Sequence, residues 1–284
     1  MPARSLGING NDLLYRLFQD LLDRDDDSSR ELIRLIIESY AVWFPPSLYS
    51  RLPVLLPWVV RDAKCRPHAI AGSPGQKTPD EWGSPSASGF QRDDNSLIKG
   101  LKSTLAVKGP AGSLIDGATL ANGFVACHVW REVRLEELAS RDPRLNSFVP
   151  NLVWLPSQIA KLSDLEGGPV QEALKKVSKQ IYQSTRVDPS VQSAIDQIWD
   201  LLPSGKSNVE VDLANLHWFD TTKNYIEYRI SAIDRTIEFC DAIAQGIPFP
   251  TKGRISTRYF SGLPQLGPEV ASNVASQIRL THKP

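Results

Sequence analysis

The spacing of apolar positions predicts two helices near the start of the chain. Leucines recur at helical intervals from Leu13 to Leu22, and this stretch ends at a run of acidic residues. A second apolar stripe extends from Ser28 to Tyr40 and ends before Pro45, because a proline cannot donate the backbone hydrogen bond that continues a helix. We expect these two helices to bury their apolar faces against one another.

The second half of the chain shows the same helical periodicity. Apolar residues repeat every three or four positions over about 171–182, 191–202, 221–244 and 268–280. Gly246 follows the third of these segments, where glycine commonly ends a helix. The sequence therefore predicts four further helices after residue 150.

The middle of the chain lacks this periodicity. Residues 61–100 are rich in Gly, Pro and Ser, which is typical of a surface loop or linker. The segment also contains Trp82 and Phe90, and long loops in compact domains are often functional. Short apolar pieces at 104–107 and 123–129 predict strands.

Composition excludes several classes of protein. The chain has 284 residues, with 32 Lys and Arg against 32 Asp and Glu. This balance argues against a polybasic protein that coats nucleic acid by bulk positive charge alone. A local basic groove is still allowed. No apolar run approaches the roughly 20 residues of a membrane helix, and the N-terminus has no signal-peptide pattern. The three cysteines form no CxxC pair, so we expect a cytoplasmic protein without a structural zinc site.

The segment 123–164 contains the most informative chemistry. An apolar strand leads to His128 in the sequence CHVW, and a polar stretch with Asn146 separates it from a second apolar strand, NLVWLP, which begins at Asn151. Pro156 can open a helix after this strand. Over about residues 122–170, this order of strand histidine, asparagine, strand and helix resembles the HNH nuclease superfamily, whose members share a ββα-metal finger.

The resemblance implies a role for three residues. His128 would be the general base that activates water and would lie at the metal, since a neutral imidazole accepts a proton at pH 7. Asn151 would orient this histidine or support the finger, and Asp164 would be a metal ligand, for Mg²⁺ or another divalent cation such as Mn²⁺. Two positions depart from the pattern: Cys127 precedes the histidine in place of an acidic ligand, and Ala160 occupies the usual position of a helical ligand.

With this resemblance, the predicted fold class is α+β, mainly α-helical with a small ββα-metal-finger-like element. Four segments follow one another: helical residues 1–60, the loop and short strands of 61–121, an HNH-like core at 122–185, and helical residues 186–284. They are also compatible with one continuous domain. The alternative for His128, Asn151 and Asp164 is structural, as a core histidine, a turn residue and a helix-end residue.

A second group of polar residues precedes this segment. Asp93, Asp94 and Lys99 are residue types that hold a metal and polarise water in nucleases. Helix capping is the alternative explanation, because Asp94 and Asn95 precede the helix-like sequence SLIKGL. We treat these four residues, together with Asn146, as supporting candidates for the site around His128.

Two stretches of the neutral chain are locally basic. Residues 61–110 contain eight basic and five acidic residues, and residues 250–284 contain five basic residues and one acidic residue. Basic residues beside aromatic ones suit contacts with the nucleic-acid backbone and bases, although an exposed basic surface is the simpler alternative. The candidate nucleic-acid contacts are Arg92, Lys102, Lys252, Arg254 and Arg258.

The sequence thus favours an enzyme, a divalent-metal-dependent HNH-like DNA endonuclease of the kind that serves in restriction or phage defence. We expect DNA as its partner, no membrane association, and a homodimer or a partner subunit as further options. The alternative is a non-catalytic nucleic-acid-binding or protein-interaction module with a degenerate finger, which Cys127 and Ala160 would allow.

Overall fold

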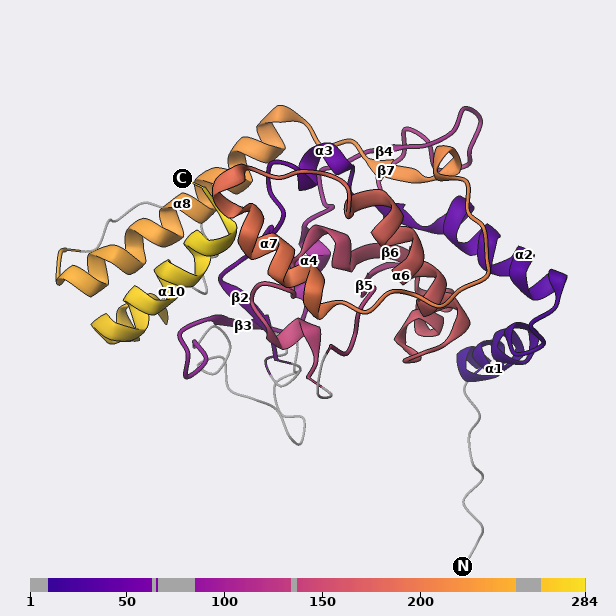
Figure 1. The fold of residues 1–284 in the computed structure, drawn as a ribbon, viewed down its shortest axis with the longest axis horizontal. Helices are drawn as coiled ribbons and strands as arrows, with labels where there is room; N and C mark the ends of the chain where they lie inside the picture. The colour runs from indigo at the N-terminus through magenta and orange to yellow at the C-terminus, as the bar shows by residue number, and fades with distance from the viewer. Residues whose placement is uncertain (1–9, 63–64, 66–84, 134–136, 249–261, 284) are drawn as a thin grey trace, which may run out of the picture.

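A mixed five-stranded sheet forms the centre of the protein. The computed structural model describes residues 10–62, 65, 85–133, 137–248 and 262–283 (Figure 1). In spatial order the strands are β4 (Val107–Lys108), β7 (His217–Phe219), β1 (Val42–Trp43), β6 (Leu152–Pro156) and β5 (Phe124–His128). β1 is parallel to β7, and the other neighbours are antiparallel. All four sequence segments contribute a strand, so they share one sheet.

A second, smaller sheet and a set of helices surround this centre. β2 (Val59–Arg61) pairs in parallel with β3 (Gln91–Asp93). The helices are α1 (Gly10–Leu22), α2 (Asp27–Leu35), α3 (Pro46–Tyr49), α4 (Ser96–Gly100), α5 (Ser157–Ala160), α6 (Pro169–Tyr182), α7 (Pro189–Leu201), α8 (Lys223–Gln245) and α10 (Pro268–Thr281). In Figure 1, α8 and α10 lie side by side at one end of the molecule, and α1 and α2 lie at the other. The prediction of a mainly helical α+β fold is confirmed.

The helices of the second half agree closely with the sequence pattern. The predicted segments 171–182, 191–202, 221–244 and 268–280 correspond to α6, α7, α8 and α10. At the start of α8, the Thr222 side chain accepts a hydrogen bond from the backbone N–H of Tyr225. At its end, Gly246 adopts a left-handed conformation with φ of 66°. Local signals therefore determine both ends of this helix.

The predicted ββα element is not confirmed. β5, β6 and α5 do follow one another, and β5 pairs with β6 in the antiparallel register His128↔Leu152. However, α5 is a single turn that continues as a 3-10 turn, η6 (Lys161–Asp164), and β6 lies inside the larger sheet. The strand predicted at 104–107 is also wrong in its bounds, because β4 contains only Val107 of that segment.

Aromatic side chains fill the core beside the central strands. The ring of Phe44 packs edge-on against Trp154 at 5.3 Å between centroids, and Phe219 lies 5.0 Å from both rings. Tyr182 of α6 donates a hydrogen bond of 2.5 Å to the backbone carbonyl of Phe44. This contact fixes α6 against the sheet, because a buried hydroxyl needs a partner.

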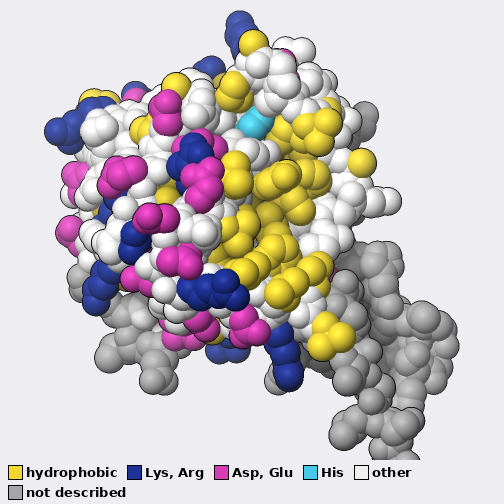
Figure 2. Space-filling model, turned by 90° about the vertical axis from the view of Figure 1, so that its right-hand side faces the viewer, with side chains coloured by type: hydrophobic (Ala, Val, Ile, Leu, Met, Phe, Trp, Pro, Cys, Tyr) yellow, Lys and Arg dark blue, Asp and Glu magenta, His cyan; other side chains and the backbone are white. Residues whose placement is uncertain are grey.

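The N-terminal helices bury one another only in part. α1 contacts α2 and α5, yet Leu13 and Leu17 are each 53% exposed and Leu14 is also exposed. Figure 2 faces the side of the molecule that carries α1 and α2, and hydrophobic side chains gather there beside a region of mixed charge. Within the described ranges, no helix is long and apolar enough to span a membrane.

Replacing Gly246 by alanine tests the end of α8. A Cβ at this position meets no other atom within 4 Å, so the expected cost is that of the left-handed backbone alone, about 1 kcal/mol of unfolding free energy. Gly100 is the control, because it also has open space around it but does not have a positive φ. We expect urea denaturation to show a loss for Gly246→Ala and none for Gly100→Ala. Equal denaturation midpoints for the two variants would contradict the left-handed conformation of Gly246 at the end of α8.

Candidate functional site

A pocket of about 750 Å³ lies where the end of β5 meets the small sheet. Its charged and titratable lining residues are Arg61, Asp62, Arg92, His128, Arg131, Arg141 and Asp164. Apolar residues complete much of the rest, namely Val60, Phe90, Leu138 and Pro143, together with Ser86, Ser88 and Ser140. Of the predicted site residues, His128, Asp164 and Arg92 therefore share one pocket.

His128 is held in one orientation at the wall of this pocket. It is the last residue of β5 and is only 9% exposed. Its Nε2 lies 2.9 Å from the backbone oxygen of Asn146. Since a carbonyl only accepts, Nε2 is the donor, and Nδ1 carries the lone pair in the neutral ring. Burial lowers the pKa of His128 to about 4, the hydrogen bond to Asn146 opposes this change, and nearby Arg61 adds to it. The imidazole is therefore neutral at pH 7.

Asn151 closes the connection between β5 and β6. Its Oδ1 accepts a hydrogen bond of 2.7 Å from the backbone N–H of Trp130, and its Nδ2 donates one of 3.0 Å to the carbonyl of Leu145. The side chain is fully buried and is not part of the described pocket lining. The resemblance implied that Asn151 either orients His128 or supports the finger. Its two hydrogen bonds agree with a supporting role, here for the connection between β5 and β6.

Asn146 joins the small sheet to the strand of the histidine. Its Nδ2 donates to the carbonyl of Val59 on β2 at 3.1 Å, and its own carbonyl receives the hydrogen bond of His128. Next to it, Ser147 accepts two hydrogen bonds, from the backbone of Leu55 to its carbonyl and from that of Leu56 to its hydroxyl. The β5–β6 connection is thus fastened to the segment that leads into β2.

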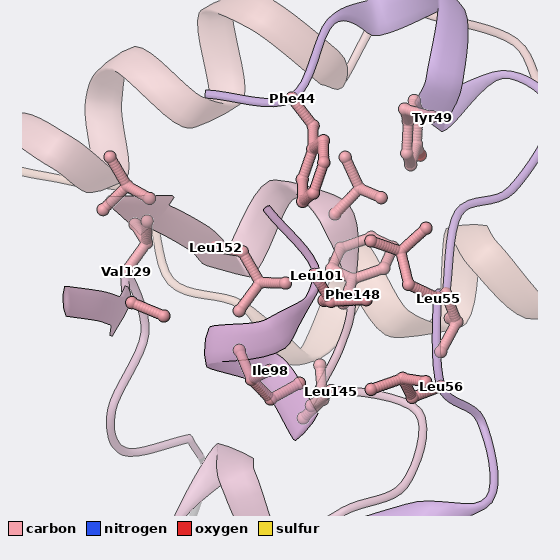
Figure 3. Packing of buried hydrophobic residues seen from close by; sticks show 14 of the residues in the cluster. Phe44, Tyr49, Leu55, Leu56, Ile98, Leu101, Val129, Leu145, Phe148 and Leu152 are labelled. Carbon is pink, nitrogen blue, oxygen red and sulfur yellow. The ribbon is translucent and has the colours of Figure 1, made fainter. Parts of the chain in front are cut away.

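α4 and its capping residues form part of the support behind the pocket. Figure 3 shows Ile98 of α4 and Leu101, which caps the end of α4, in one packed cluster with Leu145 and Leu152. This cluster supports the connection from within the core.

The polar residues before α4 interact with that helix. Asp93 accepts hydrogen bonds from the Ser96 hydroxyl at 2.6 Å and from the backbone of Leu97 at 2.9 Å, and Asp94 accepts one from the backbone of Ser96 at 3.2 Å. Asn95 has a φ of 86° and makes no side-chain cap hydrogen bond. Lys99 is exposed. None of the four predicted residues is part of the described pocket lining, and the contacts of the two aspartates are those of helix caps.

Asp164 contributes a carboxylate to the pocket at the end of η6. Burial raises the pKa of this carboxyl, while the positive charges of Arg131 and Arg61 act in the opposite direction. The guanidinium of Arg131 also donates a hydrogen bond of 2.7 Å to the backbone carbonyl of Asp164. Asp164 is therefore held near the arginines of the pocket rather than isolated.

The pocket is electropositive. Four guanidinium groups face two carboxylates, which leaves a net charge of +2 on the described lining when His128 is neutral. Arg92 lies 3.4 Å from Asp62 in an ion pair. In contrast, the side chains of Arg61 and Arg141 form no hydrogen bond or ion pair with another described residue. These two exposed guanidiniums are available to an anion.

This set of residues fits an anion better than a resident divalent cation. Within the described ranges there is no group of three or more His, Cys, Asp and Glu residues placed to hold a metal. Asp62 already pairs with Arg92, and the surrounding guanidiniums repel a cation. The described lining therefore does not fit Mg²⁺ as a resident ion, and Mg²⁺ stays a prediction of the sequence.

Of the remaining candidate basic residues, the structure describes Lys102, which is not among the residues that line the pocket. The ammonium group of Lys102 donates a hydrogen bond to the backbone carbonyl of Leu120, and burial lowers its pKa. Lys252, Arg254 and Arg258 lie outside the described residues. Sequence reasoning missed Arg131 and Arg141 as site residues, although their position in the polar stretch just after His128 is a signal that could have found them.

Comparisons with protein-family models, with curated protein sequences and with solved structures find no match for this chain. The interpretation of the pocket therefore depends on the residues and geometry of this protein.

Asn151→Ala tests the closure of the β5–β6 connection. The substitution leaves the Trp130 N–H and the Leu145 carbonyl without their buried partner, so we expect a loss of about 2 kcal/mol or more in unfolding free energy. Asn208→Ala removes the same group at an exposed position and should change the value by no more than about 0.5 kcal/mol. Denaturant titration measures the unfolding free energy of both variants. If both change it by a similarly small amount, the hydrogen bonds of Asn151 do not hold the β5–β6 connection closed.

The buried imidazole predicts a dependence of stability on pH. Above pH 6.5 the ring is neutral in both states, whereas between pH 6.5 and about 4 the unfolded chain binds a proton that the folded protein does not. The unfolding free energy should therefore decrease as the pH is lowered from 6.5 to about 4. Relative to His128→Gln, the wild type should lose about 2 kcal/mol more between pH 7 and pH 4.5. Parallel curves for the two proteins would show that His128 does not titrate in this way.

Proposed function

We propose that the protein hydrolyses phosphodiester bonds in DNA, as an HNH-like endonuclease whose active site is the pocket at His128. The observation that carries this proposal is a neutral histidine, oriented by Asn146, at the wall of a pocket lined by four arginines. Such a pocket combines a proton acceptor with groups that neutralise a phosphate, which are two requirements of phosphoryl transfer.

The proposed reaction is an attack of water on phosphorus. Nδ1 of His128 takes a proton from the water, whose oxygen then bonds to phosphorus as the bond to the leaving oxygen breaks. The leaving oxygen takes a proton from solvent. Arg61 and Arg141 bind the non-bridging oxygens, on which negative charge increases in the transition state. A role in restriction or phage defence is what the resemblance to HNH nucleases implies, and the cytoplasmic location is inferred from the cysteine pattern and the N-terminal sequence.

The second candidate function is a non-catalytic nucleic-acid-binding protein. The burial of His128 favours it, because a ring with a pKa of about 4 is a weaker base than an exposed histidine. In this case the arginines would bind phosphate without hydrolysis, and the histidine would only fasten β5 to the connection.

Cleavage of DNA by the wild type and by His128→Ala separates the two functions. We expect the wild type to nick or linearise DNA and the variant to lose activity by about 100-fold or more. Reactions with Mg²⁺, with Mn²⁺ and with EDTA measure the predicted metal requirement independently. Both plasmid and single-stranded circular DNA serve as substrates.

The matched control removes another imidazole. His282 pairs with Asp234 at 2.8 Å and is not part of the described pocket lining, so His282→Asn should cleave like the wild type. Near-UV circular dichroism checks that each variant is folded. If folded His128→Ala is as active as the wild type, or if the wild type cleaves under none of these conditions, the hydrolase is excluded.

A further inference from the structure

The size of the pocket limits which part of a nucleic acid can enter it. A volume of about 750 Å³ lies in the range of small-ligand sites, roughly 300–1,000 Å³. A single nucleotide fits in such a space, whereas a double helix does not. Any contact with a duplex would therefore be confined to the rim of the pocket.

The lining also differs from what a duplex presents. Arginines provide partners for phosphate, but Val60, Phe90, Leu138 and Pro143 provide an apolar surface in the same pocket. In a duplex the faces of the bases are stacked inside, and phosphates and sugars line the outside. An unpaired nucleotide exposes both a phosphate and the face of a base, so it matches both parts of the lining.

Within the part of the chain that the structure describes, two of the four arginines of the pocket, Arg61 and Arg141, have no hydrogen bond or ion pair that an entering phosphate would have to replace. Arg92 pairs with Asp62, and Arg131 donates to the backbone of Asp164, so these two side chains already have partners. Arg61 ends β2 and Arg141 ends the 3-10 turn η4 (Ala139–Arg141), and both are exposed.

The backbone around both arginines is fixed. A hydrogen bond of 2.7 Å links the backbone of Asp62, next to Arg61, to the carbonyl of Asp93. Another, of 2.9 Å, links the backbone of Ala139 in η4 to the carbonyl of Arg131. Arg61 and Arg141 therefore extend from two backbone segments that are each held by hydrogen bonds, β2 and η4. Guanidinium groups anchored in this way favour bidentate binding of a phosphate.

We propose that the pocket binds one unpaired nucleotide, with its phosphate on Arg61 and Arg141 and its base against the apolar lining around Leu138. The preferred substrate is then single-stranded DNA or a strand displaced from a duplex. This inference rests on the proposed function for its catalytic meaning, but the binding preference is measured separately.

Fluorescence anisotropy tests the preference directly. The full-length wild type in EDTA is titrated into a short labelled DNA strand and into the blunt duplex of the same sequence, after a gel has shown that the labelled DNA stays intact. We expect the strand to bind about tenfold more tightly than the duplex, a difference of the size that stacking of one base produces. A duplex with a central unpaired bulge should bind like the strand.

Variants assign the contacts. Arg61→Ala and Arg141→Ala should each weaken binding of the strand by about tenfold, while Arg61→Lys should lose less because it keeps the charge. Arg51→Ala is the control, since it removes one exposed charge outside the described pocket lining. Leu138→Ser should weaken binding of the strand and leave that of the duplex unchanged.

The results separate this inference from the proposed function. A duplex that binds as tightly as the strand, arginine variants that behave like Arg51→Ala, or no binding of DNA would each overturn the nucleotide site. Strand preference that depends on Arg61 and Arg141, without cleavage that depends on His128, would keep the nucleotide site and reject the hydrolase. Cleavage that depends on His128 but prefers intact duplex would do the reverse.

Discussion

The candidate site depends on the hydrogen bonds that two buried amide side chains, those of Asn146 and Asn151, make in the connection between β5 and β6. Asn151 forms hydrogen bonds with Trp130 at the start of this connection and with Leu145 near its end. Asn146 links the connection to Val59 and to His128. Because unpaired polar groups in a protein interior cost several kcal/mol, these amides hold the connection in one conformation. The histidine, the arginines of the connection and the small sheet acquire their relative positions from it.

This arrangement also explains how a chain without net charge contains a pocket whose described lining carries a net charge of +2. The net charge of zero describes the whole sequence, whereas the pocket gathers arginines from β2, β3 and the β5–β6 connection. Many acidic residues are used elsewhere, in helix caps and in ion pairs, as with Asp93 at α4 and Glu166 at the buried ammonium of Lys175. Local folding, rather than composition, determines the field at His128.

Local patterns predicted the helices and the strand of His128, because their periodicity and caps lie within short stretches of sequence. α8 is the clearest example, with Thr222 before it and Gly246 after it. The central strand β1 has only two residues, which is too short for any periodicity to show. β2 pairs with β3 and contacts η4, which lie far from it in the chain, so a pocket lined by both Arg61 and Arg141 could not be predicted. His128 and Asp164, which the sequence singled out, do line one pocket. For Asp93 and Asp94 the sequence left a metal role and helix capping open, and their hydrogen bonds to α4 agree with capping.

The parallel pairing of β1 with β7 has a consequence for biosynthesis. Val42 pairs with His217, so one edge of β1 has no partner until the 175 residues that follow Val42 have been synthesised (217 − 42 = 175). Contacts between such distant residues slow folding, and an unpaired strand edge can join another chain. The N-terminal portion of the nascent chain is therefore exposed to misassembly during translation, and the sheet becomes complete only after β7 has been synthesised.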